Sequence, residues 1–312
     1  MSVALLIFHL LVLAVAPIFL IGVINRVKSI WAGRRGPKLY QSWFDLTRLL
    51  RKTPVYSRAT SWLFPFAPYF VLATTISAGL IAPAVPGFAV IAFPGDLIVL
   101  AYLLAFGRIP LMLSALDTGS AFEGMGASRE ATYSALLEPV LLLSVGTLGC
   151  LNNAMSFQDL VSGSSGTEFD IAVRIVITFA LFVVLLIESS RVPADDPATH
   201  LELTMVHEVM VLDHSGPELA AVQYSAAMKM TVFAMVIAAV VNPFPVGDGG
   251  AIAVLSMGSS LVLIVGLAGA IGLIESLTAR LRFRALPLLI LAAFLAVGIA
   301  LVAVVARQGG LR

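Results

Sequence analysis

Cysteine and charged residues are both scarce in this sequence. The single cysteine among its 312 residues, Cys150, has no second thiol with which to form an internal disulfide or a thiolate metal site. Only 12% of the residues are charged, whereas 59% are hydrophobic and the mean hydropathy is +1.00. A soluble domain of this composition would carry more apolar residues than its core could bury. The sequence therefore predicts a polytopic membrane protein.

The sequence also lacks the motifs of bond-making chemistry. It contains no GxSxG or HExxH motif, no glycine-rich phosphate loop after a strand, and no cysteine cluster for iron–sulfur or nickel. We therefore expect the chain to hold no catalytic residue and to bind no metal or cofactor itself. The net charge of +1 gives no reason to expect a nucleic-acid partner.

Eight apolar segments are each long enough to cross a bilayer core of about 30 Å as a helix. Helices are expected because lipid offers no partner to an unpaired backbone group. The predicted fold class is an all-α, polytopic membrane helical bundle, with residues 1–312 forming a single integral membrane domain. The first segment is expected to be a span, because it is too long for a signal peptide and lacks a basic start. The predicted spans are residues 3–24, 62–82, 97–115, 131–151, 171–187, 222–241, 251–274 and 286–305.

The distribution of lysine and arginine predicts the orientation of the bundle. The segment 25–61 holds nine of the nineteen basic residues, and Arg280, Arg282 and Arg284 lie together in a second loop. The intervening loops 83–95, 152–170 and 242–250 hold none. Because cytoplasmic loops carry the excess of basic residues, we expect 25–61 to be cytoplasmic and both termini to lie outside.

The basic cytoplasmic loop 25–61 is expected to contain a surface helix that begins at Gln41. Apolar and basic side chains would lie on different sides of this helix. It suits either an ordinary interfacial helix or a docking surface for soluble subunits or acidic headgroups. The apolar side comprises Trp43, Phe44, Leu46, Leu49 and Leu50, and the basic side Arg48, Arg51 and Lys52.

Ionisable residues within the predicted spans are candidates for function. Residues 116–130 are expected to form a turn-rich inner loop, with Ser128 capping the next helix. Glu138 would then lie about two turns inside the fourth span, where an ionisable side chain costs at least about 2.5 kcal/mol. Lys229, in the sixth span, could pair with Glu138 or Glu188 or extend to the interface. For Glu275 we expect a salt bridge with Arg280.

The polar segment 188–220 carries the densest group of acidic residues and histidines. Glu188 could pair with Arg191, and Pro193 and Pro197 favour an extended chain that carries Asp195 and Asp196. Carboxylates that continue from this loop to Glu188 are typical of the mouth of a proton path.

Three histidines of this segment, His200, His207 and His214, recur every seventh residue. On a helix after Pro197 they would lie near one face, close to Glu208 and Asp213. This pattern suits a proton-buffering, solvated face against a partner protein better than a metal site, since no familiar zinc spacing is present.

Four stretches of the sequence resemble one family, the subunit shared by respiratory complex I, where it is subunit 1, and by membrane-bound energy-converting nickel–iron hydrogenases such as formate hydrogenlyase. Arg34, Gly36 and Pro37 match an RxGP motif that a Gln-x3-Asp-x2-basic helix follows. The run ALDTGSAFEGMGASREA (115–131) is similar to the hydrogenase branch. Arg129 and Glu138 match an arginine and a membrane-embedded glutamate of both branches, and ESSRVPADDPATHLEL (188–203) matches a complex I motif.

This resemblance implies a non-catalytic membrane-anchor and ion-coupling subunit in a prokaryotic inner membrane. Its expected partners are the large and small iron–sulfur subunits of a soluble hydrogenase-type arm, which would hold the nickel–iron centre and iron–sulfur clusters, and antiporter-like membrane subunits. Docking to the arm would involve Arg34, Arg35, Gly36, Pro37, Gln41, Asp45 and Arg48. The proton or sodium path would involve Glu138, Glu188, Asp195, Asp196, Glu202, Glu208, Arg129, Glu130, Arg191 and Lys229.

Departures from the complex I pattern favour the hydrogenase branch. Ala198 and His200 stand at two acidic positions of the complex I loop, so a bound quinone is not expected. The run THLELTMVHEVMVLDHSGP (199–217) is similar to members of the hydrogenase 4 type. Two alternatives remain: a quinone-site subunit of a complex I-like oxidoreductase, and a stand-alone ion-coupled transporter that uses Glu138, Lys229 and Glu188. No inverted repeat supports the transporter.

Overall fold

The computed structural model describes residues 2–162, 167–192, 195, 206–246, 250–278 and 285–309. These ranges contain α-helices and a short 3-10 helix but no strand, which confirms the all-α fold class. Eight of the helices are long and apolar enough to cross a membrane, one for each predicted span. The spanning helices are α1 (Ser2–Trp31), α3 (Leu63–Ile81), α4 (Asp96–Asp117), α5 (Ala121–Asn152), α7 (Glu168–Glu188), α8 (Gly216–Val241), α9 (Gly250–Leu277) and α10 (Leu286–Gly309); the short ones are α2 (Gln41–Leu50), α6 (Phe157–Ser162) and η1 (Glu208–Val211).

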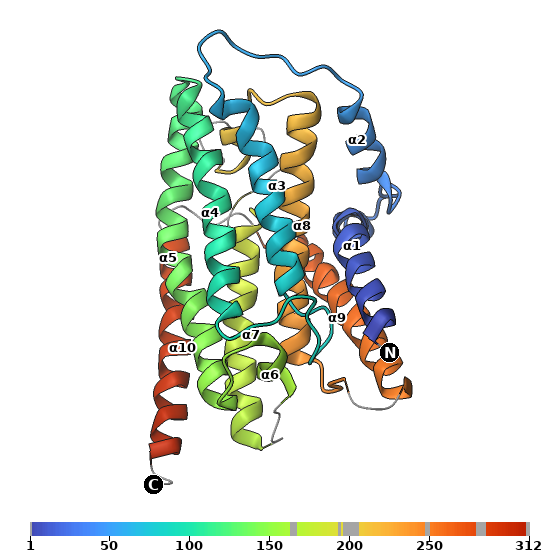
Figure 1. The fold of residues 1–312 in the computed structure, drawn as a ribbon. Coiled ribbons are helices and arrows are strands. Elements are labelled where there is room, and N and C mark those ends of the chain that lie inside the picture. Colours follow the sequence, from blue (N-terminus) through green and yellow to red (C-terminus); the bar gives the residue numbers. More distant parts are fainter. Residues whose placement is uncertain are drawn as a thin grey trace.

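The helix at the centre of the bundle is α8. In its most apolar stretch 83% of the residues are buried, against 28% for α9 and for α10, which lie on opposite sides of the bundle (Figure 1). Alanine recurs along α8, and small side chains let neighbouring helices approach closely. The outward faces of α9 and α10 are therefore free to meet lipid or other membrane subunits.

One spanning helix, α7, ends beside the middle of its neighbours. Its last residue, Glu188, contacts Arg108 and Lys229, which lie near the middle of α4 and α8. Figure 1 accordingly shows α7 in the lower half of the bundle. Beyond the end of α7, η1 packs against α4 and α5. The early end of α7 therefore lets a polar segment enter the upper half of the bundle.

The connection between α4 and α5 is shorter than the sequence predicts. The expected loop 116–130 is wrong, since α4 continues to Asp117 and α5 begins at Ala121. Gly119, at φ +70°, makes the tight turn, and Ser120 stands at the N-cap that was expected at Ser128. Gly126 lies within α5, where a Cβ atom would come within 3.0 Å of the backbone oxygen of Val206. Gly119 therefore allows a tight turn, and Gly126 allows a close contact.

The surface helix predicted from Gln41 is confirmed as α2. The side-chain amide of Gln41 donates to Asp45 Oδ1 at 3.2 Å, which links one turn to the next. Trp43 and Phe44 are exposed on it. In Figure 1, α2 stands at the edge of the bundle beyond the end of α1, and it contacts both α1 and α8.

The prediction that the histidines lie on one face of a helix is wrong for residues 206–216. His207 lies in a turn, η1 is a single short 3-10 helix, and His214 follows another turn. The carboxylate of Asp195 accepts the backbone N–H of Val206 at 2.9 Å, and the ring of His214 stacks on Phe64 at 4.0 Å. These tertiary contacts fix an irregular backbone. His200, Pro193 and Pro197 lie outside the described residues.

Candidate functional site

Four charged side chains from four spanning helices meet inside the bundle, and we call them the charge cluster: Arg108, Glu138, Glu188 and Lys229. The guanidinium of Arg108 donates to Glu188, and its Nη2 donates to Glu138 Oε1 at 2.6 Å. Lys229 Nζ donates to the other oxygen of Glu188 at 3.0 Å. Two cations thus face two carboxylates, and Glu188 is held from both sides.

Burial makes this arrangement energetically significant. The side chains of Arg108, Glu188 and Lys229 are less than a tenth exposed, whereas that of Glu138 is 38% exposed. Removing one partner of a buried ion pair leaves an uncompensated charge, which typically costs about 3 to 5 kcal/mol. Glu138 is the member of the cluster that reaches the surface of the bundle. The cluster therefore joins the interior of the chain to its lateral face.

The pairing differs in part from the prediction. Lys229 pairs with Glu188, one of its two predicted partners. The predicted ion pair between Glu188 and Arg191 does not form, because Arg191 Nη1 lies 3.6 Å from Glu275 Oε1 instead. Glu275 also pairs with Lys28 Nζ at 2.8 Å, and its predicted partner, Arg280, lies outside the described residues.

Sequence reasoning missed Arg108, which binds both carboxylates. It falls within the predicted span 97–115 and is buried near the middle of α4. The argument applied to Glu138 would have found it, because a charged residue inside an apolar helix needs a partner wherever it lies. What the sequence could not give is the identity of that partner.

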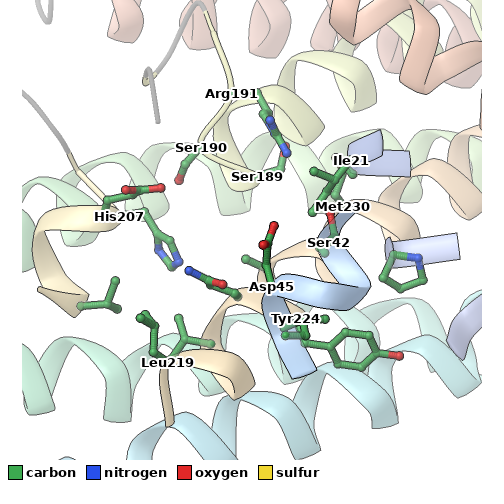
Figure 2. A pocket seen from close by; sticks show the side chains of 18 of the residues that line it. Ile21, Ser42, Asp45, Ser189, Ser190, Arg191, His207, Leu219, Tyr224 and Met230 are labelled. Carbon is green, nitrogen blue, oxygen red and sulfur yellow. The ribbon is translucent and has the colours of Figure 1, made fainter. Parts of the chain in front are cut away.

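A large cavity of about 550 Å³ lies between α1, α2, α8 and the polar segments after α7. Figure 2 shows Asp45 of α2, Ser190 and Arg191 from the segment after α7, and His207 from the turn before η1 extending into the same space. Its wall also includes apolar side chains such as those of Ile21 and Met230. The cavity is thus polar on the side of the 189–214 region and apolar toward α1 and α8. Its polar part can hold water or hydrated ions.

Two small cavities lie between the large cavity and the charge cluster. One is lined by Glu130, Glu188 and Asp195, and we call it the Asp195 cavity. The other, the His207 cavity, is lined by Glu130, His207, Arg108 and Lys229. Their volumes of about 10 and 20 Å³ suit roughly one water molecule each. Asp195 and His207 also line the large cavity, and Glu130 lines both small ones.

Both described histidines of the polar segment are neutral at pH 7. Burial lowers the pKa of His207 to about 4 and that of His214 to about 4. His214 Nδ1 lies 3.5 Å from the carboxylate of Glu218, to which Tyr56 donates a hydrogen bond. That hydrogen bond raises the pKa of Tyr56 to about 12. His214 is buried, so the solvated face predicted for these histidines is wrong for His214, whereas the half-buried His207 lines the large cavity.

The remaining predicted site residues lie in three places. Glu208 and Arg191 line the large cavity, and Arg129 donates to Met125 Sδ at 2.8 Å on α5. Asp196 and Glu202 lie outside the described residues. Of the residues predicted to dock a soluble arm, Asp45 lines the large cavity. The others lie exposed or half-buried on the surface around α2: Arg34, Arg35, Gly36, Pro37, Gln41 and Arg48.

Comparison with known proteins identifies the family. The family profile described as NADH dehydrogenase matches residues 3–306. The chain is 30% identical to hydrogenase-4 component C of Escherichia coli strain K12 over 75% of this chain and 73% of that protein. It is 29% identical to formate hydrogenlyase subunit 4 of the same strain, over 91% of this chain and 92% of that protein.

A solved structure shows that the fold recurs. A chain of the membrane-bound sulfane sulfur reductase, an archaeal respiratory membrane complex, superposes with a TM-score of 0.78 over 96% of this chain and 99% of that one. At 16% identity this likeness concerns the fold alone. The eight spans and these relatives agree on a multi-pass membrane protein. The chain belongs to the NADH dehydrogenase family, among the relatives of complex I subunit 1 and of membrane subunits of hydrogenase 4 and formate hydrogenlyase.

Proposed function

We propose that this chain is the non-catalytic membrane-anchor and ion-coupling subunit of a membrane-bound, energy-converting hydrogenase-type complex. It would link redox chemistry in a soluble arm to the movement of protons or sodium ions across a prokaryotic inner membrane. The observation that carries the proposal is the charge cluster, because four ionisable side chains in one membrane interior need a function that justifies their cost. The names of the relatives supply the class of complex.

The coupling path would begin at the large cavity and end at Glu138. Asp195 leads from the cavity wall to Glu130 and Glu188, and Arg108 then bridges Glu188 to Glu138. Arg108 pairs with both carboxylates at once. Protonation of one carboxylate would therefore leave Arg108 paired with the other carboxylate alone. A change of one pKa unit at either carboxylate corresponds to about 1.4 kcal/mol. A redox event that alters the polar segment could therefore change the protonation of Glu138.

The expected partners follow from the surfaces on either side of this path. The basic residues around α2 would dock the large and small iron–sulfur subunits, which would hold the nickel–iron centre and iron–sulfur clusters. Asp45 ties that surface to the large cavity, because it stands on α2 and lines the cavity wall. Glu138 reaches the lateral face of the bundle, where an antiporter-like subunit would receive the ion.

The variant Glu138→Gln tests the coupling role. It keeps the size of the side chain and its hydrogen bond to Arg108 but cannot carry a charge. The complex should assemble and transfer electrons, and ion movement should be lost. Assembly is measured by purification through a tag on this chain, and ion movement by acidification of inverted vesicles and by their uptake of sodium ions. Loss of the whole complex from the membrane would count against a coupling role and for a structural one.

Purification from the native membrane tests the class of complex. Mild-detergent isolation should recover antiporter-like subunits and an iron–sulfur arm, with nickel present in the preparation. An arm without nickel would instead indicate a relative that has lost hydrogen chemistry. Recovery of the chain alone would favour a stand-alone transporter.

The large cavity supports a second candidate, the quinone-site subunit of a complex I-like oxidoreductase. Its volume of about 550 Å³ and its apolar wall of Ile18, Ile21 and Met230 suit a ring with an isoprenoid tail. Quinone extracted in a fixed ratio to the purified complex, or inhibition by quinone-site inhibitors, would favour this candidate. The acidic positions replaced by Ala198 and His200 argue for the hydrogenase-type subunit.

A further inference from the structure

We propose that His207 is a proton-transfer residue that connects the large cavity to Glu130 and the charge cluster. This inference rests on the proposed coupling function, since a proton relay has a role only in a subunit that moves ions. His207 lies in the turn before η1, and its imidazole projects into the large cavity in Figure 2. It is therefore placed at the boundary between the cavity and the interior of the bundle.

The arrangement of the cavities gives His207 a position that it shares with one other titratable residue. The large cavity and the Asp195 cavity share two lining residues, Ser190 and Asp195. The large cavity and the His207 cavity share His207 and Ala226. Glu130 lines both small cavities. Two titratable side chains, one carboxyl and one imidazole, thus give separate access to the same glutamate.

The two routes differ in how their side chains are used. Asp195 Oδ2 accepts the backbone N–H of Val206 at 2.9 Å, so this carboxylate holds the residue that precedes His207. The Nε2 atom of His207 is buried and has no hydrogen-bond partner among the residues that the structure describes. A buried ring nitrogen without a partner costs free energy unless water fills its site at least part of the time. The His207 cavity has about the volume of that single water.

The imidazole has the chemistry that such a route requires. A neutral ring accepts a proton from cavity water on one nitrogen and releases the proton on the other nitrogen toward the carboxylate of Glu130. Only N–H and O–H bonds form and break, and nothing is oxidised or reduced. Lys229 lines the same small cavity, and its positive charge opposes a long-lived imidazolium. The lowered pKa of His207, about 4, agrees with a ring that is neutral between transfers.

The other described histidine of the segment, His214, is a matched control. Its pKa is also lowered to about 4 by burial, and it lines the large cavity. It does not line either small cavity, and its ring is held by stacking on Phe64. His214 therefore has the lowered pKa of His207 without the access to Glu130.

The test is chemical rescue of His207→Ala in the whole complex. Inverted membrane vesicles are supplied with reduced methyl viologen, electron transfer is followed by viologen oxidation, and proton movement by quenching of an acridine dye. Asp195 stays held by the backbone of Val206 and does not replace the imidazole, so the variant should lower protons moved per electron by about tenfold or more. Added imidazole should restore the ratio in a concentration-dependent way, because the vacated space opens onto the large cavity. His214→Ala should show no response to imidazole.

The outcomes separate this inference from the function on which it rests. Native proton movement in His207→Ala would overturn the relay. Lost movement that imidazole fails to restore in an intact complex would overturn it as well, and would assign His207 a structural role. If Glu138→Gln uncouples the complex in the same vesicles, the proposed function stands whatever His207 does. Failure of the native vesicles to take up either protons or sodium ions, or full coupling in Glu138→Gln, would overturn the proposed function together with the relay. Uptake of sodium ions without protons would overturn the relay alone.

Discussion

Two groups of buried ionisable residues in this chain use the same ion-pair chemistry in different surroundings. The charge cluster places Arg108 and Lys229 against Glu138 and Glu188, next to two water-sized cavities. The second group, which we call the clamp, places Glu275 of α9 between Lys28 of α1 and Arg191 of the polar segment.

The surroundings decide what each group can do. In the charge cluster every cation has a carboxylate and Arg108 serves two, so a proton on either carboxylate rearranges the pairs. In the clamp a single buried carboxylate holds two cations, and its protonation would leave both without a partner. The clamp also fixes Arg191 at the wall of the large cavity, three residues beyond Glu188. We therefore interpret the first group as a path and the second as a support for that path.

The largest effect is expected from Arg108→Gln, which tests whether the charge cluster depends on one shared cation. Two carboxylates would lose their common partner inside the membrane, and the native fold should lose about 3 to 5 kcal/mol of stability. The amount of assembled complex in the membrane and its thermal unfolding measure this loss.

A double variant sharpens the same prediction. Arg108→Gln combined with Glu188→Gln removes one charge of each sign, so it should recover part of the assembled complex without recovering ion movement. A double variant no more abundant than Arg108→Gln alone would mean that the loss comes from packing rather than from unpaired charge.

A smaller effect is expected from Glu275→Gln, which tests the other side of the comparison. The variant leaves Lys28 and Arg191 near each other without their carboxylate. Because their side chains are 31% and 13% exposed and water can reach both cations, the cost should be about 1 to 3 kcal/mol. The unfolding temperature should fall, whereas protons moved per electron in the surviving complexes should stay near the native value. A changed ratio at native stability would place the clamp in the path and break the distinction between the two groups.

Near neutral pH the smallest effect is expected from the two histidines beside the large cavity, because their protonation affects stability only below about pH 6.5. Burial lowers their pKa values to about 4, so the unfolded chain binds more protons than the folded one between about pH 6.5 and 4. Their contribution to stability is therefore complete above pH 6.5 and is lost as the pH falls toward 4. Thermal unfolding followed across this range should be less pH-dependent in His207→Gln and in His214→Gln. An unchanged slope in both would show that these rings are not buried neutral groups.

Much of the architecture followed from the sequence because the reason for it is local. A bilayer accepts about 20 apolar residues as a helix, so each apolar run gave one span, and all eight are present in the structure. The amphipathic pattern after Gln41 likewise gave α2. The family resemblance drawn from Arg34, Gly36, Pro37 and the 115–131 and 188–203 runs agrees with the family that the comparisons identify.

Local reasoning failed where glycines and polar residues pack against distant parts of the chain. Residues 116–130 were expected to form a loop, but Gly124 and Gly126 lie in a helix, and the polar segment packs closely against Gly126. The seven-residue spacing of His207 and His214 predicted one helical face. The hydrogen bond from Val206 to Asp195 and the stacking of His214 on Phe64 hold these residues in turns instead.

The sequence by itself determined which residues would be costly inside a membrane: Glu138 and Lys229 stand out from their apolar neighbours without any structure. Only the tertiary structure decided their partners, because Arg108, Glu138, Glu188 and Lys229 come from four helices that no local pattern brings together. The same holds for the cavities, which exist because α7 ends at Glu188 beside the middle of its neighbours. The cost of a buried charge is a property of one residue and its surroundings in lipid, whereas its compensation depends on how the helices pack.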